Sequence, residues 1–148
     1  VLQCLEDTEI RQGFDHRLDL EDLELCESLL GTEVFRAYAC YAPTGDVASA
    51  RIILSRHGSS AIGWVFGTKR EYLSSGCTQL LIAYSLADLQ NSGATGFDWT
   101  GANIPSVAAA KSAWGCQLVP YYTIRQPNAR SLASHLLQLW RFVKEHKR

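Results

Sequence analysis

The spacing of hydrophobic residues near the start of the chain predicts a helix at residues 18–31. Leu23, Cys26 and Leu30 recur at helical spacing within the sequence LDLEDLELCESLLG. Asp19 precedes the first turn as a capping residue, and a glycine follows the last apolar position. These signals place a helix with one apolar face before the first predicted strand.

Three stretches rich in β-branched and aromatic residues follow this helix, separated by the turn sequences PTGD and RHGSS. Short turns of this kind join neighbouring antiparallel strands. We therefore expect a three-stranded antiparallel meander. Its strands are predicted at residues 33–42, 47–55 and 61–68.

In the second half of the chain, helical and strand patterns alternate. Leu80, Leu81 and Tyr84 share one face of the first helix, which is apolar nearly all round and so predicted to be buried against a sheet. The predicted helices are residues 74–93, 104–114 and 128–148, and the predicted strands are residues 94–101 and 116–125. The fold class is then α/β (α+β): a mixed sheet with an antiparallel meander, a parallel βαβ crossover and helices on both faces.

Length, composition and charge favour a single globular domain. The 148 residues are 47% apolar and 20% charged, and the net charge of −1 gives no general electrostatic reason to expect a nucleic-acid partner. No apolar run reaches the roughly 20 residues of a membrane span, and the first residues do not resemble a signal peptide, so we expect a cytoplasmic protein. Because the chain has no methionine, we expect a processed chain or part of a longer one, such as the C-terminal half of a two-domain protein.

The five cysteines are widely spaced and form no metal-binding pattern with the four histidines. We expect reduced thiols and no metal site. The cysteines are Cys4, Cys26, Cys40, Cys77 and Cys116.

The first candidate for chemistry is the start of the helix at residues 74–93. Backbone N–H groups at a helix N-terminus favour anions, and a glycine there lets a phosphate approach the backbone. Lys69 and Arg70 lie just before this turn. The same residues also suit an ordinary helix cap, so both interpretations stay open. The candidate phosphate-binding residues are Ser75, Gly76, Cys77 and Thr78.

Three motifs, in this order, resemble the GNAT superfamily of acyl-CoA N-acyltransferases. They are GWVFGTKREYLSSGCTQLL, GATGFDWTG and KSAWG, which begin at Gly63, Gly93 and Lys111. Within the superfamily they are most similar to the branch of Fem-type aminoacyl transferases and their acetyltransferase-like relatives. The resemblance covers residues 18–125 and is clearest over residues 63–122.

The resemblance implies an acyl donor, acetyl-CoA or another acyl-CoA, held between two strands that part like a V. Its pantetheine would pair with the backbone of Trp64, Val65 and Phe66, and its pyrophosphate would lie on the glycine turn. Two features differ from the family pattern. Thr78 stands where the phosphate loop has a second small residue, and the chain has the length of one domain where Fem-type enzymes have two.

Four residues are candidates for the transfer chemistry. Asp98 is a candidate base, and its alternative role is to bond the loop that follows it. The resemblance places Lys111 at the reaction centre, where its charge stabilises developing negative charge; the alternative is a surface lysine packed over Trp114. Tyr121 and Tyr122 alternate across the predicted last strand, so one would face the cleft as an acid for the leaving thiolate, unless both are sheet aromatics.

Three functions remain open. The first is an acyl-CoA-dependent N-acyltransferase, in which an amino group of a small molecule or peptide attacks the thioester directly. The second is half of a Fem-like transferase that uses aminoacyl-tRNA. The third is a non-catalytic GNAT-like binding or dimerisation module, with the terminal helix docking on a second copy or on a missing domain.

Overall fold

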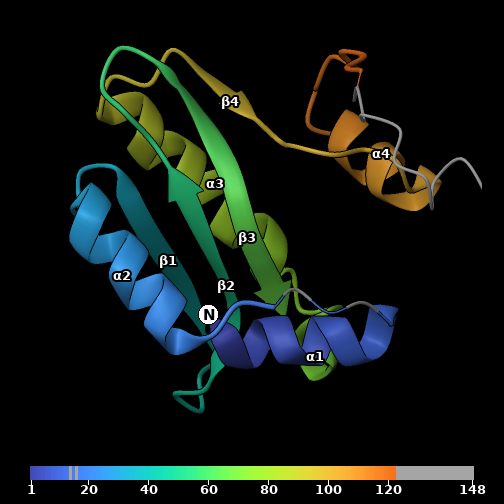
Figure 1. Ribbon diagram of the computed structural model, residues 1–148. Helices are drawn as coiled ribbons and strands as arrows, with labels where there is room; N and C mark the ends of the chain where they lie inside the picture. Colours follow the sequence, from blue (N-terminus) through green and yellow to red (C-terminus); the bar gives the residue numbers. More distant parts are fainter. Residues whose placement is uncertain (14, 16, 123–148) are drawn as a thin grey trace, which may run out of the picture. The chain divides into compact units, whose positions relative to one another are not determined.

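The computed structural model describes residues 1–13, 15 and 17–122 (Figure 1). The chain divides into two compact units, Val1–Cys116 and Gln117–Arg148, and the predicted terminal helix lies outside the described residues. The described elements are α1 (Leu2–Gln12), α2 (Leu20–Leu30), β1 (Phe35–Tyr41), β2 (Val47–Leu54), β3 (Ser60–Thr68), the 3-10 helix η1 (Arg70–Tyr72), α3 (Cys77–Asn91), β4 (Gly96–Asp98) and α4 (Pro105–Ser112).

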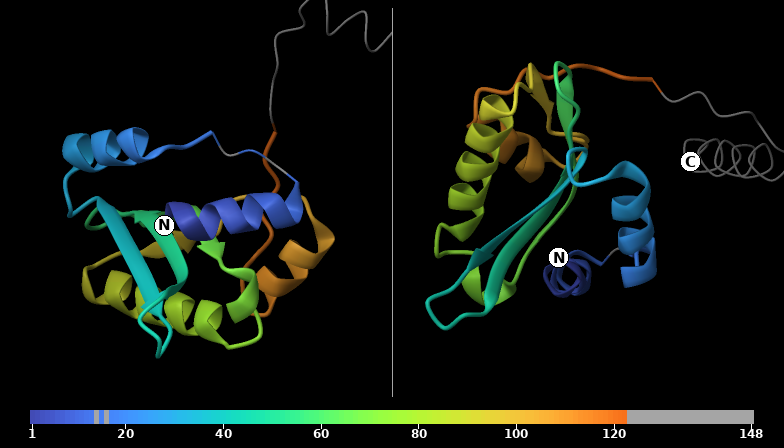
Figure 2. Two further views of the ribbon diagram at one scale, coloured as in Figure 1. Left: turned by 90° about the horizontal axis from the view of Figure 1, so that it is seen from below. Right: turned by 90° about the vertical axis from the view of Figure 1, so that its left-hand side faces the viewer.

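The strands form one mixed sheet in the order β1-β2-β3-β4. β1, β2 and β3 pair antiparallel as a meander, and β3 pairs parallel with β4 through the α3 crossover. Helices α1 and α2 lie on one side of the sheet and α3 on the other (Figure 2). The predicted fold class and the parallel crossover are confirmed.

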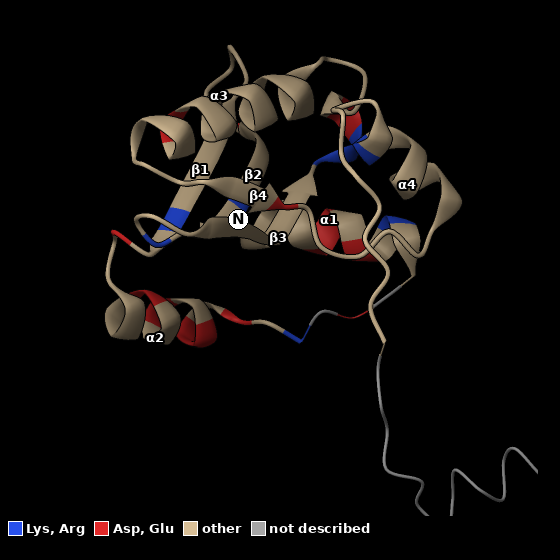
Figure 3. Cartoon of the chain, turned by 90° about the horizontal axis from the view of Figure 1, so that it is seen from above, with Lys and Arg blue, Asp and Glu red and all other residues tan. Residues whose placement is uncertain are grey.

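Local sequence explains the bounds of α2. The side chain of Asp19 accepts a hydrogen bond from the backbone N–H of Asp22 at 2.8 Å, and the Asp22 carboxylate accepts one in return from the Asp19 N–H at 3.4 Å. This reciprocal cap satisfies N–H groups that a helix end leaves without partners. Gly31 ends the helix as predicted. The acidic residues of α2, red in Figure 3, are all exposed.

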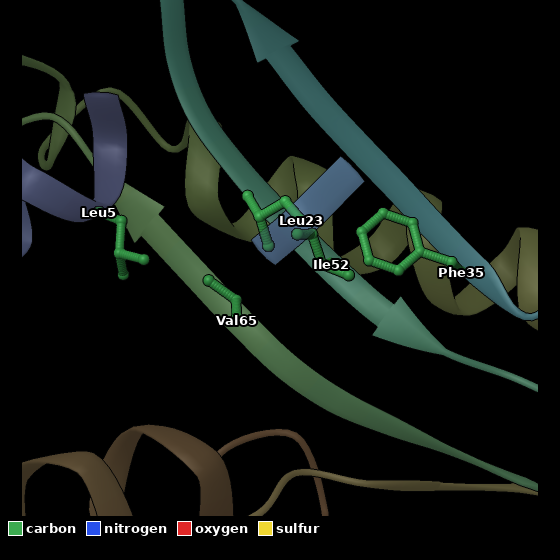
Figure 4. Packing of buried hydrophobic residues seen from close by; sticks show 5 residues of the cluster. All are labelled: Leu5, Leu23, Phe35, Ile52 and Val65. Atoms are coloured by element: carbon green, nitrogen blue, oxygen red, sulfur yellow. The ribbon is translucent and has the colours of Figure 1, made fainter. Parts of the chain in front are cut away.

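The larger apolar core lies between the sheet and the pair α1 and α2. Each of its residues is at most 8% exposed, and they come from two helices and three strands (Figure 4). These residues are Leu5, Leu23, Phe35, Ile52 and Val65. Burial of this apolar surface is the main term that holds the two helices on the sheet.

α1 is a helix that the sequence patterns did not predict. Its buried residues are Cys4, Leu5 and Thr8, and the Thr8 hydroxyl donates to the Cys4 carbonyl at 2.8 Å. The helix approaches β3 very closely at Gly67, where a Cβ atom would lie 2.4 Å from the Cys4 carbonyl oxygen. Gly67 therefore allows the backbones of α1 and β3 to touch.

The buried face of α3 differs from the predicted one. Leu81, Ser85 and Leu89 face the sheet, whereas Leu80 and Tyr84 are each 64% exposed. A serine lies at the centre of this buried stripe, so an apolar pattern alone does not identify it. The buried Ser85 hydroxyl has partners for its hydrogen bonds, since it donates to the Ile82 carbonyl at 3.0 Å and accepts from an arginine of β2.

A polar cluster joins β1 to α3. The Asp88 carboxylate accepts hydrogen bonds from Arg36 Nη1 at 3.1 Å and from the Tyr38 hydroxyl at 2.7 Å. Burial, together with the hydrogen bond to Asp88, raises the pKa of Tyr38 to about 12. The cluster fixes the last turns of α3 against the first strand.

The strand predicted at residues 116–125 is not found: residues 116–122 form neither helix nor strand. Pro120 has no N–H to donate to a sheet ladder, which disfavours a paired strand here. Residues 123–125 lie outside the described part. Within the described ranges, no helix has both the length and the apolar character needed to cross a bilayer.

Candidate active site

The site begins at the point where β3 and β4 part. Their parallel pairing covers Ser60–Ile62 on β3 and Gly96–Asp98 on β4, and β4 ends there. β3 continues to Thr68, so residues 63–68 have no strand partner on that edge among the described residues. This edge presents backbone N–H and C=O groups to which an extended ligand can bind.

The register of β2 and β3 shifts where the edge becomes free. Ile52 pairs with Val65 and Ile53 pairs with Gly63, so Trp64 is an extra residue in β3. Val65 belongs to the core, and Phe66 is 57% exposed. Such a bulge bends a strand, and bulges are frequent beside active sites.

The glycine turn lies after this edge along the chain, beyond the short helix η1. Gly76 caps α3 with a φ of 79°, and a Cβ atom there would have no neighbour within 4 Å. Ser75 Oγ accepts from the Cys77 N–H at 3.3 Å, so part of the turn acts as an ordinary cap. The N–H groups of Thr78 and Gln79 form no hydrogen bond with the described residues. The space at Gly76 is open, so the cap role is observed, and phosphate binding by this turn stays a prediction.

Hydroxyl groups attach the start of α3 to the end of β3. Thr78 Oγ1 lies 2.8 Å from Thr68 Oγ1, which lies 2.8 Å from Ser49 Oγ. Cys77 is buried, and its thiol donates to the Tyr72 carbonyl at 3.4 Å. The predicted donor-binding residues thus lie along one continuous path from the free edge of β3 to the first turn of α3.

Asp98 and Lys111 meet at the loop between β4 and α4. Asp98 Oδ1 accepts from the Thr100 N–H at 2.7 Å, and Thr100 has a φ of 58°. Lys111 Nζ donates to the carbonyl oxygens of Trp99 and Gly101, both at 2.5 Å. Burial lowers the pKa of Lys111, and the Asp98 carboxylate opposes that shift. The alternative role predicted for Asp98, bonding the following loop, is present in the structure.

Aromatic rings continue from β4 to the end of α4. The Phe97 and Trp99 rings are 5.3 Å apart and edge-on, and the Trp99 and Trp114 rings are 5.9 Å apart. These contacts hold the loop between Asp98 and Lys111 from its apolar side.

The two ends of the free edge are well separated. Asp98 pairs with Ile62 at one end, and Thr68 meets the α3 turn at the other. Six strand residues span about 20 Å. Tyr121 and Tyr122 belong to the second unit, and both are exposed. Their role stays a prediction.

Arg51 on β2 lies beside the candidate site, and the sequence patterns did not single it out. It is 6% exposed, its Nη1 donates to Ser85 Oγ at 3.2 Å, and its guanidinium lies 5.3 Å from the centre of the Phe97 ring. The available signal was a single charged residue inside the apolar strand sequence VASARIILS.

Comparison with known proteins identifies the fold. No protein-family model matches the chain, and no curated protein matches it significantly. Among solved structures, an aminoglycoside 6'-N-acetyltransferase from Acinetobacter baumannii is similar with a TM-score of 0.62 and 15% identity, over 84% of this chain and 88% of that chain. A second enzyme of that name, from Acinetobacter haemolyticus, is similar with a TM-score of 0.60 and 13% identity, over 86% and 91%.

A third similar structure is AAC(6')-Iy in complex with the bisubstrate analogue CoA-S-monomethyl-acetylneamine. Its TM-score is 0.62 and its identity 14%, over 86% of this chain and 93% of that chain. These comparisons do not support the narrower resemblance to the Fem-type branch, which stays a prediction. The chain has the GNAT fold, which it shares with these acetyltransferases.

Proposed function

We propose that this chain is an acyl-CoA-dependent N-acyltransferase that transfers an acyl group, acetyl in the simplest case, to an amino group of a small molecule or peptide. The observation that carries the proposal is the free edge of β3, whose end at Thr68 contacts the first turn of α3 beside the open Gly76 turn. A ligand with an extended amide-containing arm and a pyrophosphate matches both parts of this path. The similar structure that contains a CoA bisubstrate analogue supports the same donor.

In this proposal the donor arm pairs with the backbone of Trp64, Val65 and Phe66. The pyrophosphate lies on the turn formed by Ser75, Gly76, Cys77 and Thr78, where N–H groups and the positive end of the α3 dipole favour negative charge. The thioester then lies toward the other end of the edge, close to Asp98. No metal takes part.

The reaction is direct attack of the amine nitrogen on the thioester carbonyl carbon. A C–N bond forms, the C–S bond breaks, and the proton lost by the amine goes to a base, for which Asp98 is the candidate. Tyr121 or Tyr122 returns a proton to the thiolate. Because the Lys111 ammonium is engaged by loop carbonyls, we assign it the role of holding the loop that carries Asp98.

The acceptor is proposed only as an amino group of a small molecule or peptide. Similar structures include aminoglycoside acetyltransferases, which supports that class without naming a substrate. We expect the enzyme to act in the cytoplasm. No observation favours the aminoacyl-tRNA alternative, and a homodimer or a second domain stays a prediction.

A coenzyme A titration, followed by calorimetry or thermal unfolding, tests the proposal. We expect the wild-type chain to bind coenzyme A, and Gly76→Glu to weaken that binding by about tenfold or more, since a carboxylate would repel the pyrophosphate. Adenosine alone should stabilise neither protein.

Gly45→Glu is the matched control, because Gly45 also has a positive φ, at 90°, and open space around its Cα. Its turn joins β1 and β2, so coenzyme A binding should be unchanged. Absence of binding by the wild-type chain would rule out the proposed function. Equal losses in both variants would instead reject the assignment of the phosphate site.

A further inference from the structure

Arg51 is a buried cation without an acidic partner among the described residues. Its Nη1 is engaged by Ser85 Oγ, while its Nε is buried and forms no hydrogen bond with the described residues, and its Nη2 forms none with them either. Nε and Nη2 lie on one edge of the guanidinium. The free groups therefore form the fork that binds a carboxylate through two parallel hydrogen bonds.

This state is costly for the unliganded protein. An uncompensated buried charge destabilises a fold, and replacing such a charge with an apolar residue is often neutral or stabilising. Burial lowers the pKa of Arg51 to about 10, so the side chain is still a cation at neutral pH. Arg36 shows the usual solution, because it faces the same helix and is paired with Asp88 at 3.1 Å.

The guanidinium lies where β3 and β4 part. Its Nη2 and the backbone carbonyl oxygen of Asp98 are each 3.6 Å from the position that a Cβ atom of Gly63 would take, and the Phe97 ring is 3.0 Å from the same point. Gly63 is the residue at which pairing with β4 has ended and the bulge begins. Arg51 and the backbone of Asp98 therefore border the same end of the free edge.

We propose that Arg51 binds a carboxylate of the substrate at this end of the edge. The inference deepens the proposed function, on which it rests for the location of the reaction. The carboxylate has two possible sources: the acyl group of a dicarboxylic donor, or an amino-acid acceptor. In both cases the anion compensates the buried cation and places the reacting group beside Asp98.

The test measures the affinity of the wild-type chain for matched pairs of ligands. The donor pair is succinyl-CoA and acetyl-CoA, and the acceptor pair is glycine and glycinamide with coenzyme A bound. A third pair, free succinate and succinamide, needs no coenzyme A. We expect at least one pair to show about a tenfold preference for the carboxylate member, the size expected for hydrogen bonds to a charged group. The pair that shows it identifies the source.

Arg51→Met should remove this preference, so that each carboxylate ligand binds no better than its matched partner. Its unfolding temperature without ligand should be equal to that of the wild type or higher. Arg36→Met is the matched control. It should lower the unfolding temperature, because it removes the cationic partner of Asp88, while the carboxylate preference stays.

Three outcomes overturn the inference: no preference in any wild-type pair, the same preference in Arg51→Met, or a clear loss of stability in Arg51→Met with the preference retained. If Arg51→Met fails to fold, the wild-type pairs and Arg51→Lys, which cannot form the fork, still decide the question. Loss of all coenzyme A binding would reject the proposed function, while the succinate pair would still report on Arg51.

Discussion

The ammonium of Lys111 lies among carbonyl oxygens of the loop that connects β4 to α4. An ammonium group has three donors and no acceptor, and here they point to the loop backbone. The loop needs such a partner because Thr100 holds a positive φ that is uncommon outside glycine. At the scale of one residue, the Lys111 ammonium satisfies the loop carbonyl groups and stabilises the strained backbone at Thr100.

Lys111→Met keeps the length of the side chain and removes these hydrogen bonds. We expect the free energy of unfolding to fall by about 2 kcal/mol, as is usual when hydrogen bonds to a charged group are lost. Amide hydrogen exchange at Thr100 and Gly101 should become faster. Urea unfolding and exchange measured by mass spectrometry check the two effects.

Lys111→Arg is the informative comparison, because a planar guanidinium cannot direct its donors as the ammonium does. It should restore stability only in part. Unchanged loop exchange in Lys111→Met would show that the loop is held by its aromatic contacts alone.

At the scale of one element, α3 shows how a buried face is set by the partner surface. Leu81, Ser85 and Leu89 are spaced four residues apart, which is the spacing of one helix face. The sheet offers Arg51 opposite the middle of that face, so a hydroxyl is favoured there over an apolar side chain. Tyr84, which the sequence assigns to the buried face, lies at the edge against Tyr38.

Leu89→Ala and Leu80→Ala test this face directly. Leu89 is 2% exposed and Leu80 is 64% exposed. We expect the first change to lower the free energy of unfolding by about 3 kcal/mol, through lost burial and a cavity, and the second to change it by no more than about 0.5 kcal/mol. Urea unfolding of both variants measures the difference, and equal effects would contradict the assigned face.

Elements with their own start and stop signals could be predicted from the sequence. Asp19 and Gly31 bound α2, turn sequences bound the meander strands, and the crossover then requires a parallel β4. α1 was missed because Val1 provides no side-chain cap and the polar Thr8 belongs to its buried face. The helix packs on β3 through the close contact at Gly67, which joins residues distant in sequence.

The candidate site was predicted in part for the same reason. Ser75, Gly76 and their neighbours form a local motif. In the structure this motif lies beside Thr68, where the free edge of β3 ends. The partners of Arg51 and Lys111 come from other elements, so no local pattern reports them. Pairing across the sheet decides which polar groups are buried together.

At the scale of the whole first unit, the close contact between α1 and β3 controls the layer that covers one face of the sheet. A side chain at Gly67 would meet the backbone of Cys4 and Leu5 at 2.4 to 2.7 Å, and backbone atoms cannot move aside easily. The apolar core under α1 includes Leu5, so displacement of the helix would open that core.

Gly67→Ala should therefore lower the free energy of unfolding by about 3 kcal/mol, the upper part of the range for overpacking. Gly101→Ala is the matched control, because a Cβ atom there would have no neighbour within 4 Å and no positive φ is required. It should be close to neutral. Thermal unfolding compares the two, and a neutral Gly67→Ala would show that α1 can shift at little cost.

Polar contacts hold α3 to three different strands. Thr78 contacts Thr68 of β3, Ser85 accepts from Arg51 of β2, and Asp88 accepts from two residues of β1. Three separated attachment points restrict rolling, sliding and tilting of α3 on the sheet. The first turn of α3 is thus held at a set distance from the free edge of β3 before a ligand arrives, so a donor that binds along this path pays little conformational entropy to organise it.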